Sequence, residues 1–164
     1  MLLYLVRHGD AETLAPSDDE RTLSEKGRKV TAGMGELLHN AGFPVPDLIL
    51  ASPLPRANET ARIIAQTFAP KVGIETSDAL RPSRSIEGAM NLVASKQETC
   101  ETLMIVGHDP LLSCLVSALI CGANVPTIEM KKSAVALFEI FQFDAPRMRG
   151  VLKAFLPPRL GKNV

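Results

Sequence analysis

The chain has 164 residues, of which 46% are hydrophobic, and this length suits one domain that buries about 70% of its unfolded-chain surface. Eighteen basic and eighteen acidic residues cancel, and no segment concentrates Lys and Arg as a surface that binds nucleic acid or anionic lipid does. We therefore expect one domain over residues 1–164, with no nucleic-acid partner and no membrane partner.

The cysteines and the first residues bear on the cellular compartment. The three cysteines, an odd number, lie in apolar or helical segments at Cys100, Cys114 and Cys121. We expect free, buried thiols rather than a disulfide framework, which indicates a reducing compartment. The apolar run at 1–6 has no basic stretch before it and is too short for a signal peptide or a membrane span. The sequence therefore predicts a cytoplasmic protein.

The first predicted elements are a strand and a helix. The apolar run 2–6 is typical of a strand that is buried on both faces of a mostly parallel sheet. Ser24 can cap a helix whose apolar residues recur at helical spacing, with Gly42 as its stop. Two glycines inside it, Gly33 and Gly35, weaken this prediction by about 1 kcal/mol each relative to Ala.

A second strand and helix follow. The strand is expected at 48–51, and Ser52 followed by Pro53 resembles an N-cap with a first-turn proline. The helix after it has an apolar stripe made by Ala61, Ile64, Ala65 and Phe68. A short strand at 72–75 would come next.

The remaining segments complete an alternation of strands and helices. We predict a helix from 86 to 94, a strand at 103–106, and a very apolar helix from Pro110 to about Cys121. Two final strands, 133–140 and 151–156, are joined through 144–147 and are expected to pair antiparallel at the sheet edge. The fold class is therefore α/β, with three layers (α/β/α), a mostly parallel central sheet and an antiparallel edge.

Three predicted strand-to-helix junctions carry the chemistry. They are Arg7-His8-Gly9, the segment from Ser52 to Arg56, and Gly107-His108. Such junctions converge at the carboxyl edge of a parallel sheet, so two histidines and two arginines would meet there. A neutral imidazole is a nucleophile and a guanidinium pair chelates phosphate oxygens, which together predict phosphoryl transfer. We expect no metal and no cofactor, because no metal-ligand spacing and no Gly-rich nucleotide loop occurs.

In order and local context these residues resemble the histidine phosphatase superfamily, also called phosphoglycerate mutase-like, whose mark is Arg-His-Gly after the first strand. The matching positions in the second junction are Ser52, Pro53, Arg56, Ala57 and Thr60, and Gly107-His108-Asp109-Pro110 is similar to a third family segment. The resemblance covers nearly the whole chain. It implies a phosphoglycerate mutase-like fold, with 1–164 as one histidine phosphatase domain.

Within the family, the small size and the segments 7–11 and 21–27 most resemble the SixA-type phosphohistidine phosphatases. The resemblance implies that His8 attacks phosphorus in line, after which water hydrolyses phospho-His8. The resemblance also implies that the equatorial phosphate oxygens are held by Arg7, Arg56 and His108. For this chemistry His8 should be unprotonated on its attacking nitrogen, whereas His108 should donate to the phosphoryl group and be cationic near it.

Further residues are candidates around the phosphate. Arg21 is a candidate at the rim of the site, although a surface charge before a helix cap is an equal alternative. Gly9 and Gly107 would let the backbone approach the phosphate, or would be ordinary turn glycines. Asp109 stands where close relatives usually carry Asn, and it adds a negative charge beside the site.

A general acid is harder to place. Many family members that act on alcohol esters use an Asp or Glu to protonate the leaving oxygen. The candidates in this chain are Glu87, which could equally be a first-turn helix carboxylate, and Asp10, which could equally be a surface loop charge. Phosphohistidine has a far better leaving group than an alkoxide, so an enzyme specialised for it needs such an acid least.

These observations leave three hypotheses. The first is a phosphohistidine phosphatase that acts on a phosphotransfer or phosphorelay protein. The short segment between Arg56 and His108 leaves little chain for a lid, so we expect an open active site, which suits a protein substrate. The second is a phosphatase of small phosphate esters, or a mutase. The third is a phosphate-binding module without turnover, which would not need the nucleophile His8.

Overall fold

A six-stranded sheet in the order β3-β2-β4-β1-β5-β6 forms the centre of the computed structural model, which describes residues 1–123, 125–144 and 147–162. The strands are β1 (Leu2–Arg7), β2 (Leu48–Ala51), β3 (Gly73–Thr76), β4 (Thr102–Gly107), β5 (Val135–Gln142) and β6 (Arg149–Leu156). Strands β1 to β4 are parallel, whereas β5 pairs antiparallel with β1, and β6 with β5.

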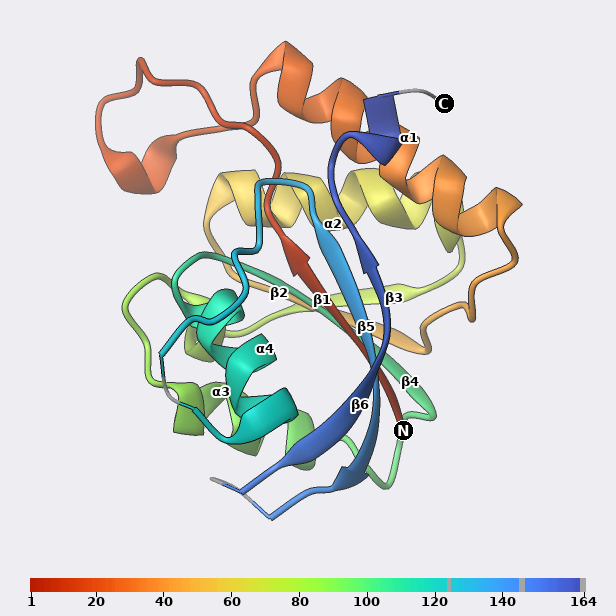
Figure 1. Ribbon diagram of the computed structural model, residues 1–164. Helices are drawn as coiled ribbons and strands as arrows, with labels where there is room; N and C mark the ends of the chain where they lie inside the picture. The colour runs from red at the N-terminus through yellow and green to blue at the C-terminus, as the bar shows by residue number, and fades with distance from the viewer. Residues whose placement is uncertain (124, 145–146, 163–164) are drawn as a thin grey trace.

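Helices cover both faces of this sheet (Figure 1). One face carries α1 (Glu25–Asn40) and α2 (Pro55–Phe68), and the other carries α3 (Ile86–Ala94) and α4 (Leu111–Cys121). In β1, Leu3 and Leu5 join the core beneath α3 and α4, whereas Tyr4 and Val6 join the core beneath α1 and α2. The three-layer fold with a mostly parallel sheet and an antiparallel edge, as predicted, is confirmed.

The predicted cap at Ser52 is wrong. Helix α2 begins at Pro55, and Leu54 occupies the N-cap position without a side-chain cap hydrogen bond. A proline at the first helical position loses no intrahelical hydrogen bond, so the helix can start there without help from Ser52. The hydroxyl of Ser52 is therefore free for another partner, described below.

The cysteines differ in part from the prediction. All three are free, but only Cys100 is buried, whereas Cys114 is half-buried and Cys121 is exposed. The predicted connection at 144–147 includes residues 145 and 146, which lie outside the described residues. Across the described ranges, no helix is long and apolar enough to cross a membrane.

Glycines let α1 pack closely against its neighbours. A Cβ atom on Gly33 would overlap the carbonyl oxygen of Gly161, in the short C-terminal helix η3 (Leu160–Lys162). A Cβ atom on Gly35 would overlap the hydroxyl of Thr67 in α2. The two residues that weakened the helix prediction are therefore required by close packing.

We expect Gly33→Ala to lower the free energy of unfolding by about 1–3 kcal/mol, because backbone has to move, although Ala is the better helix former. Urea unfolding followed by circular dichroism measures the change. The matched control is Gly88→Ala in α3, where a Cβ atom would meet only Ser85 Oγ at 3.4 Å, and the variant should be as stable as the parent or more so. Equal stability of Gly33→Ala and the parent would contradict the packing argument.

Candidate active site

The carboxyl ends of β1, β4 and β2 bring the three predicted junctions together. Hydrogen bonding continues past the strand ends, since the His8 N–H donates to the Gly107 carbonyl at 3.0 Å. On the other side of β4, the Ser52 N–H donates to the Val106 carbonyl at 2.9 Å. The junctions after β1 and β2 are thus both fastened to the end of β4, the strand between them.

The two histidines face one another at this edge. Their ring centroids lie 4.9 Å apart with an interplanar angle of 55°, and the exposed fractions are 8% for His8 and 2% for His108. Arg56, in the first turn of α2, is 5% exposed. The structure therefore gathers two histidines and an arginine from distant parts of the sequence into one buried cluster.

The hydrogen bond of His8 fixes which nitrogen can attack. Its Nδ1 lies 2.7 Å from the carbonyl oxygen of Gly9, and because a carbonyl only accepts, Nδ1 carries the proton. The lone pair is then on Nε2. Burial, aided by the nearby Arg56 and Arg7, lowers the pKa of His8 to about 4. His8 is consequently neutral near pH 7, as a nucleophile must be.

The partner of His108 is the serine that does not cap α2. His108 Nε2 lies 2.8 Å from the Ser52 hydroxyl, which also accepts a long hydrogen bond from the Leu54 N–H at 3.4 Å. We assign the hydroxyl proton to the hydrogen bond with His108 Nε2, which leaves the ring proton on Nδ1. This buried Nδ1 has no hydrogen-bond partner in the part of the chain that the structure describes.

His108 is not a cation in this structure. Burial is the largest influence that lowers its pKa to about 3, and His8 and Arg56 lower it further. Without a phosphoryl group the ring is therefore neutral, and its Nδ1–H can still donate. A phosphoryl dianion beside the ring would raise its pKa.

Arg7 is held in place by a contact with the segment that precedes β5. Its Nη1 donates to the Met130 carbonyl at 2.6 Å and lies 3.9 Å from the Asp109 carboxylate. Ser113 accepts from the Met130 N–H at 2.9 Å and donates to Asp109. Asp109 thus helps to fix Arg7. The buried Nε of Arg7, like Nδ1 of His108, has no partner among the described residues.

Arg56 has a partner that the sequence analysis missed. Its two terminal nitrogens donate to Asp18, to the carbonyl at 2.6 Å and to the carboxylate at 2.9 Å. Asp18 begins the short helix η1 (Asp18–Glu20), and its side chain is 63% exposed. A guanidinium has five N–H donors, so three remain for a phosphate. Asp18 and Arg56 are 38 positions apart, and the sequence carries no signal for this contact.

Arg21 acts on this loop rather than directly on the cluster. Its guanidinium donates to the carbonyls of Ala11 and Glu12 and, at 2.9 Å, to the Asp18 carboxylate. The hydrogen bond from Arg21 is the largest cause of the lowered pKa of Asp18, and Arg56 lowers it further. The contribution of Arg21 to the site therefore runs through Asp18.

The two glycine candidates differ. The Gly9 N–H donates to the Thr60 hydroxyl at 3.0 Å, and a Cβ atom here would lie 2.7 Å from Thr31 Oγ1. Gly9 is thus required by packing, and its N–H already has a partner. A Cβ atom on Gly107 would meet only ordinary contacts at 3.5 Å and beyond, so space does not require glycine there.

Neither acid candidate is placed as a proton donor. The Asp10 carboxylate accepts from Lys132 Nζ at 2.6 Å and from the Ser24 hydroxyl at 3.0 Å. The hydrogen bond from Lys132 is the largest cause that lowers the pKa of Asp10, so this group stays ionised. Glu87 is exposed in the first turn of α3, and no hydrogen bond or ion pair among the described residues joins it to the cluster.

The sequence of this chain matches a known protein family and several known proteins. The model of the histidine phosphatase superfamily (branch 1) matches residues 3–84. A phosphohistidine phosphatase SixA homolog from Haemophilus influenzae is 31% identical over 126 residues, which cover 73% of this chain and 77% of that protein. The chain belongs to the histidine phosphatase superfamily. It is a phosphatase, a hydrolase of phosphoryl groups.

Solved structures share the fold over almost the full length. The protein histidine phosphatase SixA complexed with tungstate superposes with a TM-score of 0.85 at 24% identity, covering 97% of this chain and 98% of that one. A putative phosphohistidine phosphatase SixA from Agrobacterium tumefaciens has a TM-score of 0.80 at 26% identity, covering 96% of this chain and 97% of that one.

In residues 1–123, 125–144 and 147–162, no group of three or more His, Cys, Asp or Glu is placed to hold a metal ion.

The lowered pKa of His8 predicts a pH dependence of stability. Between about pH 6.5 and about pH 4, His8 is protonated in the unfolded chain but neutral in the folded one. The free energy of unfolding therefore falls as the pH drops through this range. In phosphate-free buffer, His8→Gln should therefore show a shallower slope, by up to about 1.4 kcal/mol per pH unit in this window. Urea unfolding at a series of pH values measures both slopes. Equal slopes would mean that His8 is not buried in its neutral form.

The contact between Ser52 and His108 predicts a selective loss of rate. Ser52→Ala should lower kcat for phosphatase activity about 10-fold, because the His108 ring loses the hydrogen bond that fixes its tautomer. Hydrolysis of p-nitrophenyl phosphate measures it. The matched control is Ser117→Ala, a buried serine of α4 that bonds to Thr127 and should lose stability without a comparable loss of kcat. A similar kcat for Ser52→Ala and the parent would contradict the role of Ser52.

Proposed function

We propose that this phosphatase hydrolyses phosphohistidine on a phosphotransfer or phosphorelay protein, through a phospho-His8 intermediate, with residues 1–164 acting as one domain. The observation that carries the proposal is that the two carboxylates in the loop after β1 are already paired with cations. Asp10 accepts from Lys132, and Asp18 accepts from Arg21 and Arg56. These hydrogen bonds lower the pKa of both groups, so both are ionised near pH 7 and hold no proton for a leaving group. The relative from Haemophilus influenzae, a SixA homolog, supports the same substrate class.

The first step transfers the phosphoryl group to His8. The Nε2 lone pair attacks phosphorus in line, a P–N bond forms, and the P–N bond of the substrate breaks as its electron pair returns to the leaving imidazole. Arg7 and Arg56 offset the negative charge of the equatorial oxygens, and Nδ1–H of His108 donates to one of them. The leaving imidazole takes its proton from water, so no carboxylic acid is needed.

The second step releases phosphate. Water attacks phosphorus, a P–O bond forms, and the P–N bond to His8 breaks with its electron pair returning to Nε2. The hydrogen bond from Nδ1 to the Gly9 carbonyl stabilises phospho-His8 with its ring proton in place and keeps the ring oriented. The products are inorganic phosphate and the starting form of the enzyme.

The alternative within the same superfamily is a phosphatase of small phosphate esters, or a mutase. An alkoxide leaving group needs a proton, and an ester phosphatase therefore benefits from a protonated carboxyl group that faces the nucleophile. The ionised Asp10 and the exposed Glu87 do not supply one. This alternative predicts fast hydrolysis of esters such as phosphoserine.

The test compares substrates directly. The protein is incubated with a histidine phosphotransfer domain that has been phosphorylated with phosphoramidate, and separately with phosphoserine and p-nitrophenyl phosphate. We expect kcat/KM to be at least about 100-fold higher on phosphohistidine, since its leaving group needs no acid. Fast ester hydrolysis without action on phosphohistidine would overturn the proposal.

Substitution of the nucleophile tests the mechanism. His8→Ala should lose at least about 1,000-fold in kcat/KM on phosphohistidine, and it should no longer acquire the acid-labile, base-stable phosphoryl label. The matched control is His39→Ala, an exposed histidine in the last turn of α1, which should keep full activity. Retention of activity by His8→Ala would remove His8 from the mechanism.

A further inference from the structure

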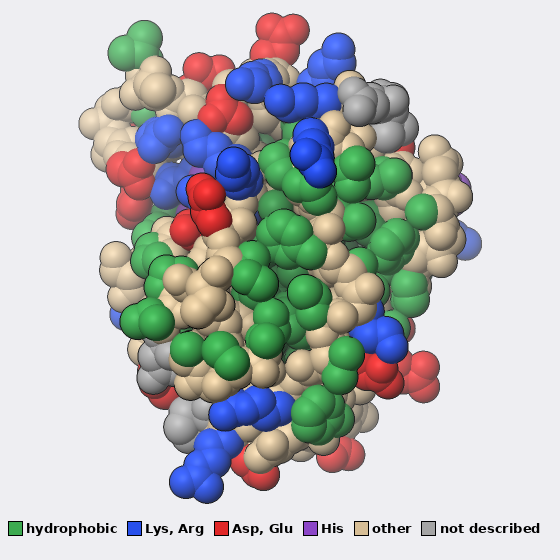
Figure 2. All heavy atoms as spheres, in the orientation of Figure 1, with side chains coloured by type: hydrophobic (Ala, Val, Ile, Leu, Met, Phe, Trp, Pro, Cys, Tyr) green, Lys and Arg blue, Asp and Glu red, His purple; other side chains and the backbone are tan. Residues whose placement is uncertain are grey.

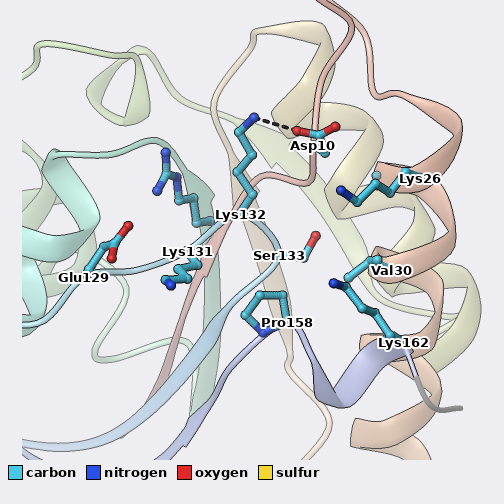
Figure 3. A pocket seen from close by; sticks show the side chains of 11 residues that line it. Asp10, Lys26, Val30, Glu129, Lys131, Lys132, Ser133, Pro158 and Lys162 are labelled. Carbon is cyan, nitrogen blue, oxygen red and sulfur yellow. Dashed lines mark hydrogen bonds and ion pairs between the residues drawn. The ribbon is translucent and has the colours of Figure 1, made fainter.

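A cavity of about 360 Å³ lies next to the phosphoryl site and shares Arg7 with it. Its walls come from four separate parts of the chain: the end of β1 with Asp10, the start of α1, the segment 129–133 before β5, and residues 158 and 162. Figure 3 shows Lys26 and Lys162 entering from one side, with Lys131 and Lys132 on the other. Apart from Arg7, the residues of this cavity play no part in the proposed phosphoryl transfer.

The lining of the cavity is strongly basic. Five basic residues and two acidic ones contribute to it: Arg7, Lys26, Lys131, Lys132 and Lys162 against Asp10 and Glu129. Lys132 is paired with Asp10 at 2.6 Å, a contact drawn in Figure 3. In the part of the chain that is described, Lys26, Lys131 and Lys162 have no acidic group within 4.0 Å, the limit for a salt bridge. These three amines are therefore available to an incoming anion.

The surface around the cavity is rich in basic side chains although the chain as a whole is neutral. Lys and Arg side chains gather along the upper part of the face in Figure 2, with some Asp and Glu side chains among them, where α1 begins and η3 lies in Figure 1. The equal numbers of basic and acidic residues in the sequence hide this asymmetry, because the lysines come from three distant segments. Such a local field steers an acidic partner towards the site.

We propose that this cavity binds the carboxylate side chains that flank the phosphorylated histidine of a substrate protein. The proposal rests on the proposed function and names the feature by which the substrate is recognised. Because Arg7 borders both the cavity and the phosphoryl site, the two sites are adjacent, and the ligand we propose extends past Arg7 from one to the other. An acidic segment next to a phosphohistidine meets this condition.

The lining of the cavity suits the carboxylates of an acidic peptide. Ammonium groups on flexible stems attract anions as point charges, so they can follow carboxylates at several positions along a docked segment. Gly27 of α1 also lines the cavity, but its N–H is not available to a ligand because it donates to Ser24 Oγ at 3.0 Å. Val30 and Pro158 supply apolar contact for the stems of Asp and Glu side chains. A docked acidic peptide therefore finds charge and apolar surface together.

The test uses two phosphohistidine peptides that differ only in their flanking residues, Asp and Glu in one and Asn and Gln in the other. At low ionic strength we expect the wild-type protein to have a kcat/KM about 10-fold higher on the acidic peptide. The triple variant Lys26→Gln/Lys131→Gln/Lys162→Gln should lose this preference and keep its kcat/KM on the neutral peptide. The control Lys71→Gln/Lys153→Gln removes two exposed lysines outside the cavity and should keep the preference.

Charge reversal gives a second, independent measurement. Lys131→Glu/Lys162→Glu should prefer a peptide whose flanking residues are Lys over the acidic peptide, the reverse of the wild-type order. Equal kcat/KM of the wild-type protein on acidic and neutral peptides would overturn the cavity proposal and leave the phosphohistidine activity intact.

A binding measurement distinguishes failure of the cavity proposal from failure of the proposed function. If no phosphohistidine peptide is hydrolysed, the proposed function fails, and the cavity is tested by fluorescence anisotropy with the unphosphorylated acidic peptide. The wild-type protein should bind this peptide about 10-fold more tightly than the triple variant does. Equal affinities would refute the carboxylate site.

Discussion

Parallel pairing of β1 with β4, and of β4 with β2, is the constraint on which the phosphoryl site depends. The register places Arg7 opposite Gly107 and Ala51 opposite Val106, so that the residues next in sequence leave the sheet side by side. A slip by one residue would turn every side chain of a strand to the other face. The apolar residues of β1 and β4, buried on both faces, exclude such a slip because it would exchange the two cores. The packing of the sheet therefore fixes how the two histidines meet.

The same arginines that would hold the phosphate also tune the nucleophile. Arg7 and Arg56 lower the pKa of His8 and His108, in addition to the larger effect of burial. Because both imidazoles are neutral, the positive charge at the site comes from the two arginines, with a smaller contribution at His8 from Lys132. That division suits a nucleophile, because the histidine keeps its lone pair while the cations stay charged.

Most of the fold could be predicted because its signals are local and periodic. Buried strands appear as short apolar runs, and helices α1, α3 and α4 follow from apolar spacing with Ser, Pro or Gly at the ends. The predicted cap at Ser52 was wrong because two prolines, Pro53 and Pro55, could each open a helix, and the helix begins at Pro55 while Ser52 bonds to His108. The prediction that Arg7, His8, Arg56 and His108 lie at one sheet edge followed from topology, since junctions after adjacent parallel strands converge.

The remaining features of the site depend on tertiary contacts. The bond between Asp18 and Arg56 joins an exposed loop to a buried helix start, and no periodicity marks it. The charge state of His108 depends on burial and neighbouring charges, which a sequence does not give. The basic cavity is invisible in a linear count of charges because its lysines are separated by more than 100 residues, from Lys26 to Lys131.

The packing of Gly161 against Val30 and Met34 has a consequence for the order in which the protein is completed. Nascent chains emerge from the N-terminus, so His8, Arg56 and His108 are all synthesised before η3. Lys162 follows them and is held beside α1 by this packing. The cavity is therefore completed later than the phosphoryl site, and a protease that cut between β6 and η3 would remove a wall of the cavity while sparing every residue of the histidine pair.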